Sequence, residues 1–136
     1  MAVEFPIGTK VISLGRVADP VVPLLVRTVR GYLPFDFLID TGADCSMIPA
    51  SIAETELGVP LARLPHDVFF GIEGHGIRVY RGWLPIKIGP YPLRVRCVFS
   101  TREHGPLILG RLGVFRHFSI AFDNRRHIVR FTKISR

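Results

Sequence analysis

Long apolar runs are missing from this sequence of 136 residues. No stretch reaches the roughly 20 uninterrupted apolar residues that a membrane-spanning helix needs, since Pro23 and Arg27 interrupt the segment VVPLLVRTVR. The start, MAVEFPIGTKVISLGR, lacks a basic region followed by an apolar stretch and a small-residue cleavage site, so we expect no signal peptide. These absences lead us to expect a protein without a transmembrane span, located in the cytoplasm.

Cysteine is scarce as well. Cys45 and Cys97 have no metal-ligand spacing, and two cysteines are too few for the disulfide framework of a small secreted domain. We therefore expect two buried or half-buried thiols. The histidines show no paired spacing with a third acid or thiol, which leads us to expect neither a metal site nor a cofactor. Trp83 is the single tryptophan and is interpreted as a sheet residue.

What the sequence does contain suits one compact domain over residues 1–136. Hydrophobic residues make up 48% and charged residues 21% of the chain, and no repeat or linker-like segment divides it. The net charge of +7 would favour acidic partners. Since the chain has neither a long basic helix nor an aromatic RNA-binding signature, we expect no nucleic-acid partner. A basic nucleic-acid-binding β module stays open as an alternative, which salt-dependent binding would support.

Eight short segments rich in Val, Ile and Phe predict β-strands. They cover residues 21–30, 35–40, 66–72, 77–89, 92–100, 106–110, 118–123 and 127–134. Turn signals such as Gly89-Pro90 and Asp123-Asn124 separate them. The pattern predicts an all-β sandwich or barrel. One short helix is expected after Pro49, with Gly58 placed to cap it, and a further helical turn or two after Gly110.

The stretch FLIDTGAD, residues 37–44, raises the main functional question, because it ends an apolar strand with a carboxylate. Burial penalises the charged form of an acid, so Asp40 needs a partner or a function. Thr41 can hydrogen-bond through its hydroxyl, and Gly42 permits close approach of a backbone or ligand. The triplet Asp-Thr-Gly alone is a weak signal, since chance supplies it often.

The flanking residues make the signal more specific. FLIDTGADCSMIP (37–49) and PLILGRLGVF (106–115) together resemble the retropepsin-like aspartic protease family, in its cellular and bacterial branch. The resemblance implies one lobe of the acid protease fold, a closed, orthogonal β-barrel with one or two short helices. VFFGIEGHGIRVYRG (68–82) is similar to the flap that covers substrate in this family. The flap residues so implied are Gly71, Ile72, Glu73, Gly74, His75 and Gly76.

The family resemblance implies peptide-bond hydrolysis with Asp40 as the catalytic residue. This chemistry uses two carboxylates that share a proton and hold one water. The other aspartates, Asp19, Asp36, Asp44, Asp67 and Asp123, lack a following Thr-Gly or Ser-Gly. The second carboxylate must therefore come from another copy, and a twofold homodimer would bring the two turns together.

The resemblance also implies roles for the neighbours of Asp40. Thr41 would reach across the dimer, and Gly42 would present its backbone to a polypeptide substrate. Ala43 has no hydroxyl to stabilise the charged pair, so we expect activity in mildly acidic to near-neutral conditions. Asp44 and Arg111 would form a partly buried ion pair that ties the turn to the segment after Gly110.

The C-terminal stretch FSIAFDNRRHIVRFTKISR departs from the compact retroviral pattern and predicts a hairpin turning at Asp123-Asn124. Its last strand either pairs across the twofold axis or completes the chain's own sheet, and the sequence leaves both open. A catalytically weak or inactive retropepsin-like domain for dimerisation or peptide binding is therefore the alternative function.

Overall fold

The computed structural model describes residues 1–70, 74–102 and 105–135. The strands in these ranges are β1 (Ala2–Pro6), β2 (Gly8–Ile12), β3 (Gly15–Asp19), β4 (Val21–Thr28), β5 (Gly31–Ile39), β6 (Ser46–Pro49), β7 (His66–Phe70), β8 (Gly76–Ile88), β9 (Tyr91–Ser100), β10 (Leu107–Leu109), β11 (Phe118–Asp123) and β12 (Ile128–Lys133). The helical elements are α1 (Ala50–Thr55) and a short 3₁₀ turn, Leu61–Arg63.

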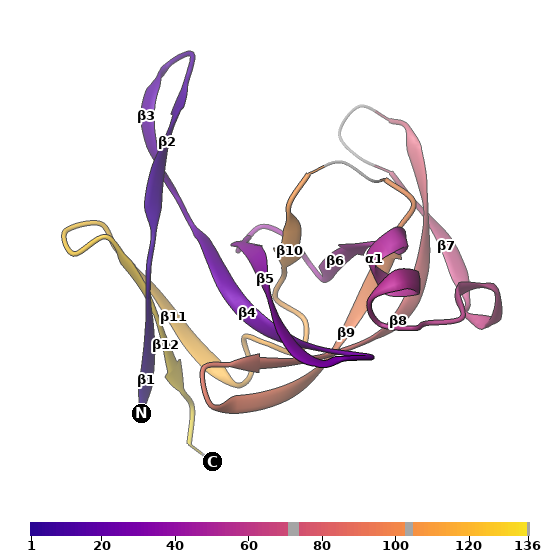
Figure 1. The fold of residues 1–136 in the computed structure, drawn as a ribbon. Helices are drawn as coiled ribbons and strands as arrows, with labels where there is room; N and C mark the ends of the chain where they lie inside the picture. Colours follow the sequence, from indigo (N-terminus) through magenta and orange to yellow (C-terminus); the bar gives the residue numbers. More distant parts are fainter. Residues whose placement is uncertain (71–73, 103–104, 136) are drawn as a thin grey trace.

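The central feature is a closed barrel (Figure 1). Its strands run in the order β4-β5-β10-β6-β9-β8, and β4 pairs with β8 at Leu25–Lys87 and Val26–Ile86 to close the sheet on itself. β7 lies outside this closure and pairs with β8 as an antiparallel hairpin. The sequence-predicted all-β barrel is thereby confirmed.

Alternating side chains fill the barrel. In β4, Val22, Leu24 and Val26 are almost completely buried, while the residues between them are more exposed. They pack with apolar side chains from the other strands, among them Phe37, Ile39, Ile48, Leu84, Ile86, Ile88, Val95, Phe99 and Leu109. Burial of this apolar surface is the main contribution that holds the barrel strands in register.

The helices are shorter than expected. α1 follows Pro49 as predicted, and Gly58 adopts a left-handed φ of +66° shortly after the helix ends. The segment after Gly110 contains hydrogen-bonded turns in place of a helix. Gly113, with φ of +77°, interrupts it, because a left-handed residue cannot continue a right-handed helix.

The C-terminal hairpin forms as predicted and belongs to a separate sheet with the order β1-β12-β11. β12 lies in the middle, so both of its edges are paired within its own chain. Of the two open possibilities, the terminal strand completes the chain's own sheet. Glu4 on β1 accepts hydrogen bonds from Arg126 and from Arg130 on β12, which fastens the N-terminal strand to the C-terminal one.

A second hairpin, formed by β2 and β3, stands away from the barrel (Figure 1). We call residues 8–19 the arm. The strand pattern missed β1, β2, β3 and β6. Every residue of β2 is exposed, so no apolar alternation marks a buried face there, whereas β1 and β6 are short, with five and four residues. Among the described residues, no helix is long and apolar enough to cross a membrane.

Candidate active site

Asp40 lies where two parallel barrel strands end side by side. β5 ends at Ile39 and pairs in parallel with β10, which ends at Leu109. The amide of Asp40 donates to the carbonyl oxygen of Leu109 at 3.1 Å, and the amide of Ala43 donates to the carbonyl oxygen of Asp40 at 3.2 Å. The chain therefore turns sharply at Asp40 while its backbone stays fixed to the barrel.

The turn also positions the Asp40 side chain. The amide of Gly42 donates to Asp40 Oδ1 at 2.9 Å, which fixes the orientation of the carboxylate. A Cβ atom on Gly42 would lie 3.3 Å from the same oxygen, so glycine suits this close approach. Asp40 is half-buried, whereas Thr41 and Gly42 are exposed. A pre-oriented carboxylate thus borders a surface that a second molecule can reach.

Gly110 holds the other side of the turn through a close backbone approach. Its amide donates to the buried hydroxyl of Ser46 at 3.0 Å. A Cβ atom on Gly110 would lie 2.4 Å from the carbonyl carbon and oxygen of Cys45, closer than any side chain tolerates. Glycine is therefore required where the chain after β10 passes the turn.

The structure brings Asp44 and Arg111 together. Arg111 Nη2 donates to the carboxylate oxygen Oδ1 of Asp44. Two backbone hydrogen bonds accompany this contact. The Arg111 amide donates to the carbonyl oxygen of Ala43 at 3.0 Å, and the Leu112 amide donates to the carbonyl oxygen of Asp44 at 2.9 Å. The ion pair was expected to be partly buried. Instead, the Asp44 side chain is 92% exposed and a single nitrogen–oxygen contact is made. Exposed pairs contribute little, so the backbone hydrogen bonds carry most of this connection in the single chain.

The β7–β8 hairpin contains the remaining sequence-predicted residues. Gly71, Ile72 and Glu73 lie outside the described residues. Gly74 and His75 are exposed, with Gly74 at φ of +80°, and Gly76 begins β8 opposite Phe70. In Figure 1 the end of β5 lies between the arm, on the left, and this hairpin, on the right.

A hollow of about 170 Å³ opens beside β10. Ile108 on β10 pairs with Met47 on β6, and both line the hollow. The other lining residues are Pro49, Ser100, Arg102, Gly105 and Pro106. Leu109, the next residue of β10, accepts the hydrogen bond from the Asp40 amide through its carbonyl oxygen, so the hollow and the Asp40 turn border the same strand. The largely apolar hollow is suited to an apolar side chain of a bound molecule.

The two thiols are poor nucleophiles. Burial, with a smaller effect of the neighbouring Asp44 charge, raises the pKa of Cys45 above its ordinary value. Burial, followed by the influence of Cys45, raises the pKa of Cys97 to about 12. Since the thiolate is the reactive form, neither cysteine is suited to nucleophilic chemistry at neutral pH. Within the described ranges, no group of three or more His, Cys, Asp and Glu side chains could hold a metal ion.

Sequence reasoning missed two contributors to this site. Ser46 is fully buried and accepts the hydrogen bond from the Gly110 amide. The sequence feature that could have indicated this role is a hydroxyl side chain at the start of the apolar run SMIP (46–49). Pro20 accepts a hydrogen bond from the amide of Ile39 at 2.9 Å through its carbonyl oxygen. This second contact had no sequence signal, because it depends on the pairing of β4 with β5.

Comparisons with known proteins agree with this geometry. A family model for aspartyl proteases matches residues 25–114. The fold is similar to that of a retropepsin-like aspartic protease from Rickettsia conorii, with a TM-score of 0.66, 14% identity, and coverage of 96% of this chain and 89% of that one. It is also similar to the EIAV protease solved with the inhibitor HBY-793, with a TM-score of 0.52, 22% identity, and coverage of 68% and 82%. No curated protein sequence matches the chain.

Proposed function

The chain belongs to the aspartyl protease family, and on that premise we propose that it is a homodimeric endopeptidase whose active site contains Asp40 from each of two copies. One observation carries the proposal. The chain has a single Asp-Thr-Gly turn, and its Asp40 carboxylate is oriented by Gly42 beside an exposed surface. A second carboxylate with the same orientation can approach only from another copy, and a twofold axis beside Asp40 would supply it.

In such a pair, the two carboxylates hold one water between them. The ionised Asp40 takes a proton from the water as it attacks the scissile carbonyl carbon, and the protonated Asp40 donates its proton to the carbonyl oxygen. As the tetrahedral intermediate collapses, the amine leaves with the proton that the first Asp40 took from the water, and the second Asp40 takes back its proton from the hydroxyl group of the intermediate. The pair must share one proton because two like charges at this range do not both ionise easily.

The neighbouring residues would position the peptide. The backbone of Gly42 borders an extended substrate, the hollow beside Ile108 takes an apolar side chain, and the β7–β8 hairpin covers the substrate as a flap. Thr41 is exposed at the surface that the second copy would cover. Ala43 adds no hydroxyl to the pair, so we expect cleavage to be fastest between mildly acidic and neutral pH.

Peptide cleavage by the purified protein tests this proposal. Asp40→Asn keeps the size of the side chain but removes the proton-transfer group, so we expect kcat to fall by a factor of about 100 or more. Asp36→Asn is the matched control, since Asp36 lies exposed on the same strand and we expect full activity. Circular dichroism checks that both variants fold.

Two results would contradict the proposal. Undiminished cleavage by Asp40→Asn would show that Asp40 is not the catalytic residue. Tight peptide binding by a dimer without any cleavage, at acidic and at neutral pH alike, would instead favour a dimerisation or peptide-binding domain.

A further inference from the structure

The arm exposes apolar side chains that its own chain leaves uncovered. Val11 is 70% exposed, Ile12 42%, Leu14 93% and Val17 37%. Its two strands pair with each other and form a separate two-stranded sheet. The register places Ile12 and Val17 on one face of the arm and Val11 on the other. Such an isolated hairpin is marginally stable in water, and exposed apolar residues that share a face commonly mark an interaction surface. Both properties indicate that another surface covers the arm.

The base of the arm lies next to the Asp40 turn. The arm ends at Asp19, and the carbonyl oxygen of Pro20, the next residue, accepts the hydrogen bond from the amide of Ile39. Ile39 directly precedes Asp40. A second copy that brings its own Asp40 to this one must therefore lie close to the base of the arm.

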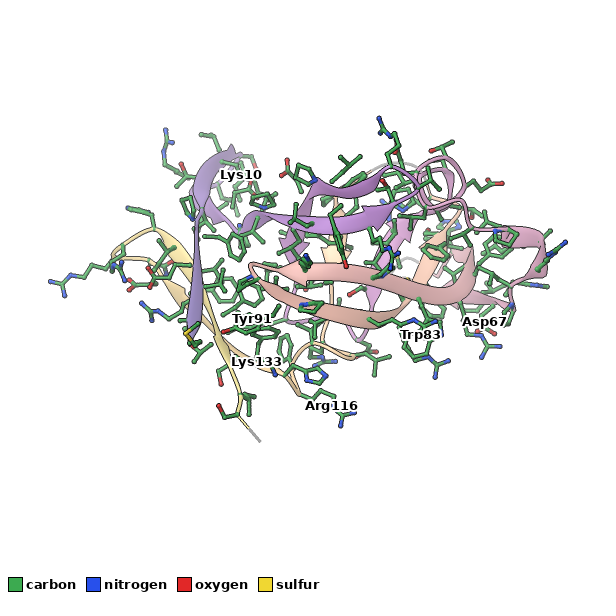
Figure 2. All side chains as sticks on the ribbon, turned by 60° about the horizontal axis from the view of Figure 1, so that its bottom comes forward. Lys10, Asp67, Trp83, Tyr91, Arg116 and Lys133 are labelled. Atoms are coloured by element: carbon green, nitrogen blue, oxygen red, sulfur yellow. The ribbon has the colours of Figure 1, made fainter. Side chains whose placement is uncertain are left out.

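Symmetry indicates which part of the second copy the arm would meet. The arm and the β7–β8 hairpin lie on opposite sides of the end of β5 in Figure 1, and Figure 2 shows the same separation between Lys10 on the arm and Asp67 on β7. A half-turn about an axis that passes beside Asp40, between the arm and the β7–β8 hairpin and perpendicular to the line that joins them, exchanges these two sides. It carries the arm of one copy toward β7 of the other.

β7 offers a matching apolar surface. Val68 is 52% exposed and Phe70 72%, and both lie beside Gly76, so they share one face of β7. β7 is also the edge strand of its sheet. We propose that the arm of each copy packs against β7 of the second copy. This inference rests on the proposed homodimer and names the surfaces that hold it together beside the substrate cleft. Since symmetry forms the contact twice per dimer, dimerisation would also hold both β7–β8 hairpins in place.

Removal of the apolar side chains from the arm tests the contact. We expect Ile12→Ser combined with Leu14→Ser to raise the dimer dissociation constant at least about tenfold in sedimentation equilibrium, because four apolar side chains per dimer would be removed from the buried contact. Val29→Ser is the matched control, since Val29 is 67% exposed in the β4–β5 turn, and it should leave dimerisation and cleavage unchanged. An unchanged dissociation constant in the double variant would overturn the proposal.

A disulfide cross-link tests the position of the arm. In the variant Leu14→Cys with Val68→Cys, mild oxidation should link two copies into a covalent dimer on a non-reducing gel. Leu14→Cys with Val29→Cys should stay largely unlinked under the same conditions. Equal cross-linking in both variants would show random collision and would contradict a specific arm–β7 contact.

The outcomes separate this inference from the proposed function. A dimer that needs Asp40 for cleavage but is indifferent to the arm variants would overturn the arm contact alone. A wild-type protein that cleaves peptides as a monomer would overturn both, since the arm would then have no second copy to meet.

Discussion

At the residue scale, the position of Asp40 is explained by its immediate neighbours. The apolar strand before it anchors the turn in the barrel, and Gly42 orients its carboxylate. The sequence predicted an apolar strand that ends at this carboxylate and a glycine that permits close approach. It did not predict that the Gly42 amide binds Asp40 Oδ1, which depends on the geometry of the turn. The approach of Gly110 to Cys45 was not predictable, since it depends on packing between segments far apart in the chain.

Gly110 provides a residue-scale prediction. In Gly110→Ala, the new methyl group would overlap the Cys45 backbone, which cannot move away as a flexible side chain could. We expect the free energy of unfolding to fall by about 1–3 kcal/mol, the usual cost of overpacking. Chemical denaturation measures it. Gly8→Ala is the control, because no atom lies within 4 Å of its added Cβ; equal losses in both variants would contradict the steric explanation.

At the scale of elements, prediction succeeded where one face of a strand is buried. β4 and β8 show the alternation that burial imposes, and both were expected from the sequence. β2 and β3 are exposed on both faces, so they carry no such pattern. The segment after Gly110 was expected to form a helical turn or two, but its Gly, Val, Phe and His residues favour helix weakly, and Gly113 takes the left-handed conformation that glycine adopts readily.

The contact between β1 and β12 provides an element-scale prediction with a defined pH dependence. Hydrogen bonds from Arg130 and then Arg126 lower the pKa of Glu4 below its ordinary value of 4.5. Because the folded-state pKa is lowered, the stabilisation is fully present above about pH 4.5 and is lost as pH falls through the lower, folded-state value.

Glu4→Gln tests this dependence. We expect the variant to unfold at lower denaturant concentration than the wild type at pH 7, with a difference that shrinks as pH falls below the ordinary pKa of 4.5. Glu54→Gln, on the exposed side of α1, should show no such convergence. A difference between wild type and Glu4→Gln that stays constant into the acid range would contradict the ion-pair explanation.

At the scale of the whole molecule, the family resemblance anticipated the barrel, but its closure by β4 and β8 was not readable from the sequence. Strand order and register arise from contacts between distant segments, and alternation reports only which face is buried. The same limit applies to the dimer. One Asp-Thr-Gly turn per chain predicts a second copy, whereas the surfaces that would meet, the arm and β7, emerge only from the three-dimensional arrangement.

The most direct test of the two-copy active site is a mixing experiment with wild-type protein and Asp40→Asn. The two are combined in varying ratios at constant total concentration, allowed to exchange subunits, and assayed for peptide cleavage. If each site needs Asp40 from both copies, only wild-type dimers are active, so activity falls with the square of the wild-type fraction, to about a quarter in an equal mixture. A linear decrease, to about half, would show that each chain cleaves with its own Asp40 and would contradict the shared site.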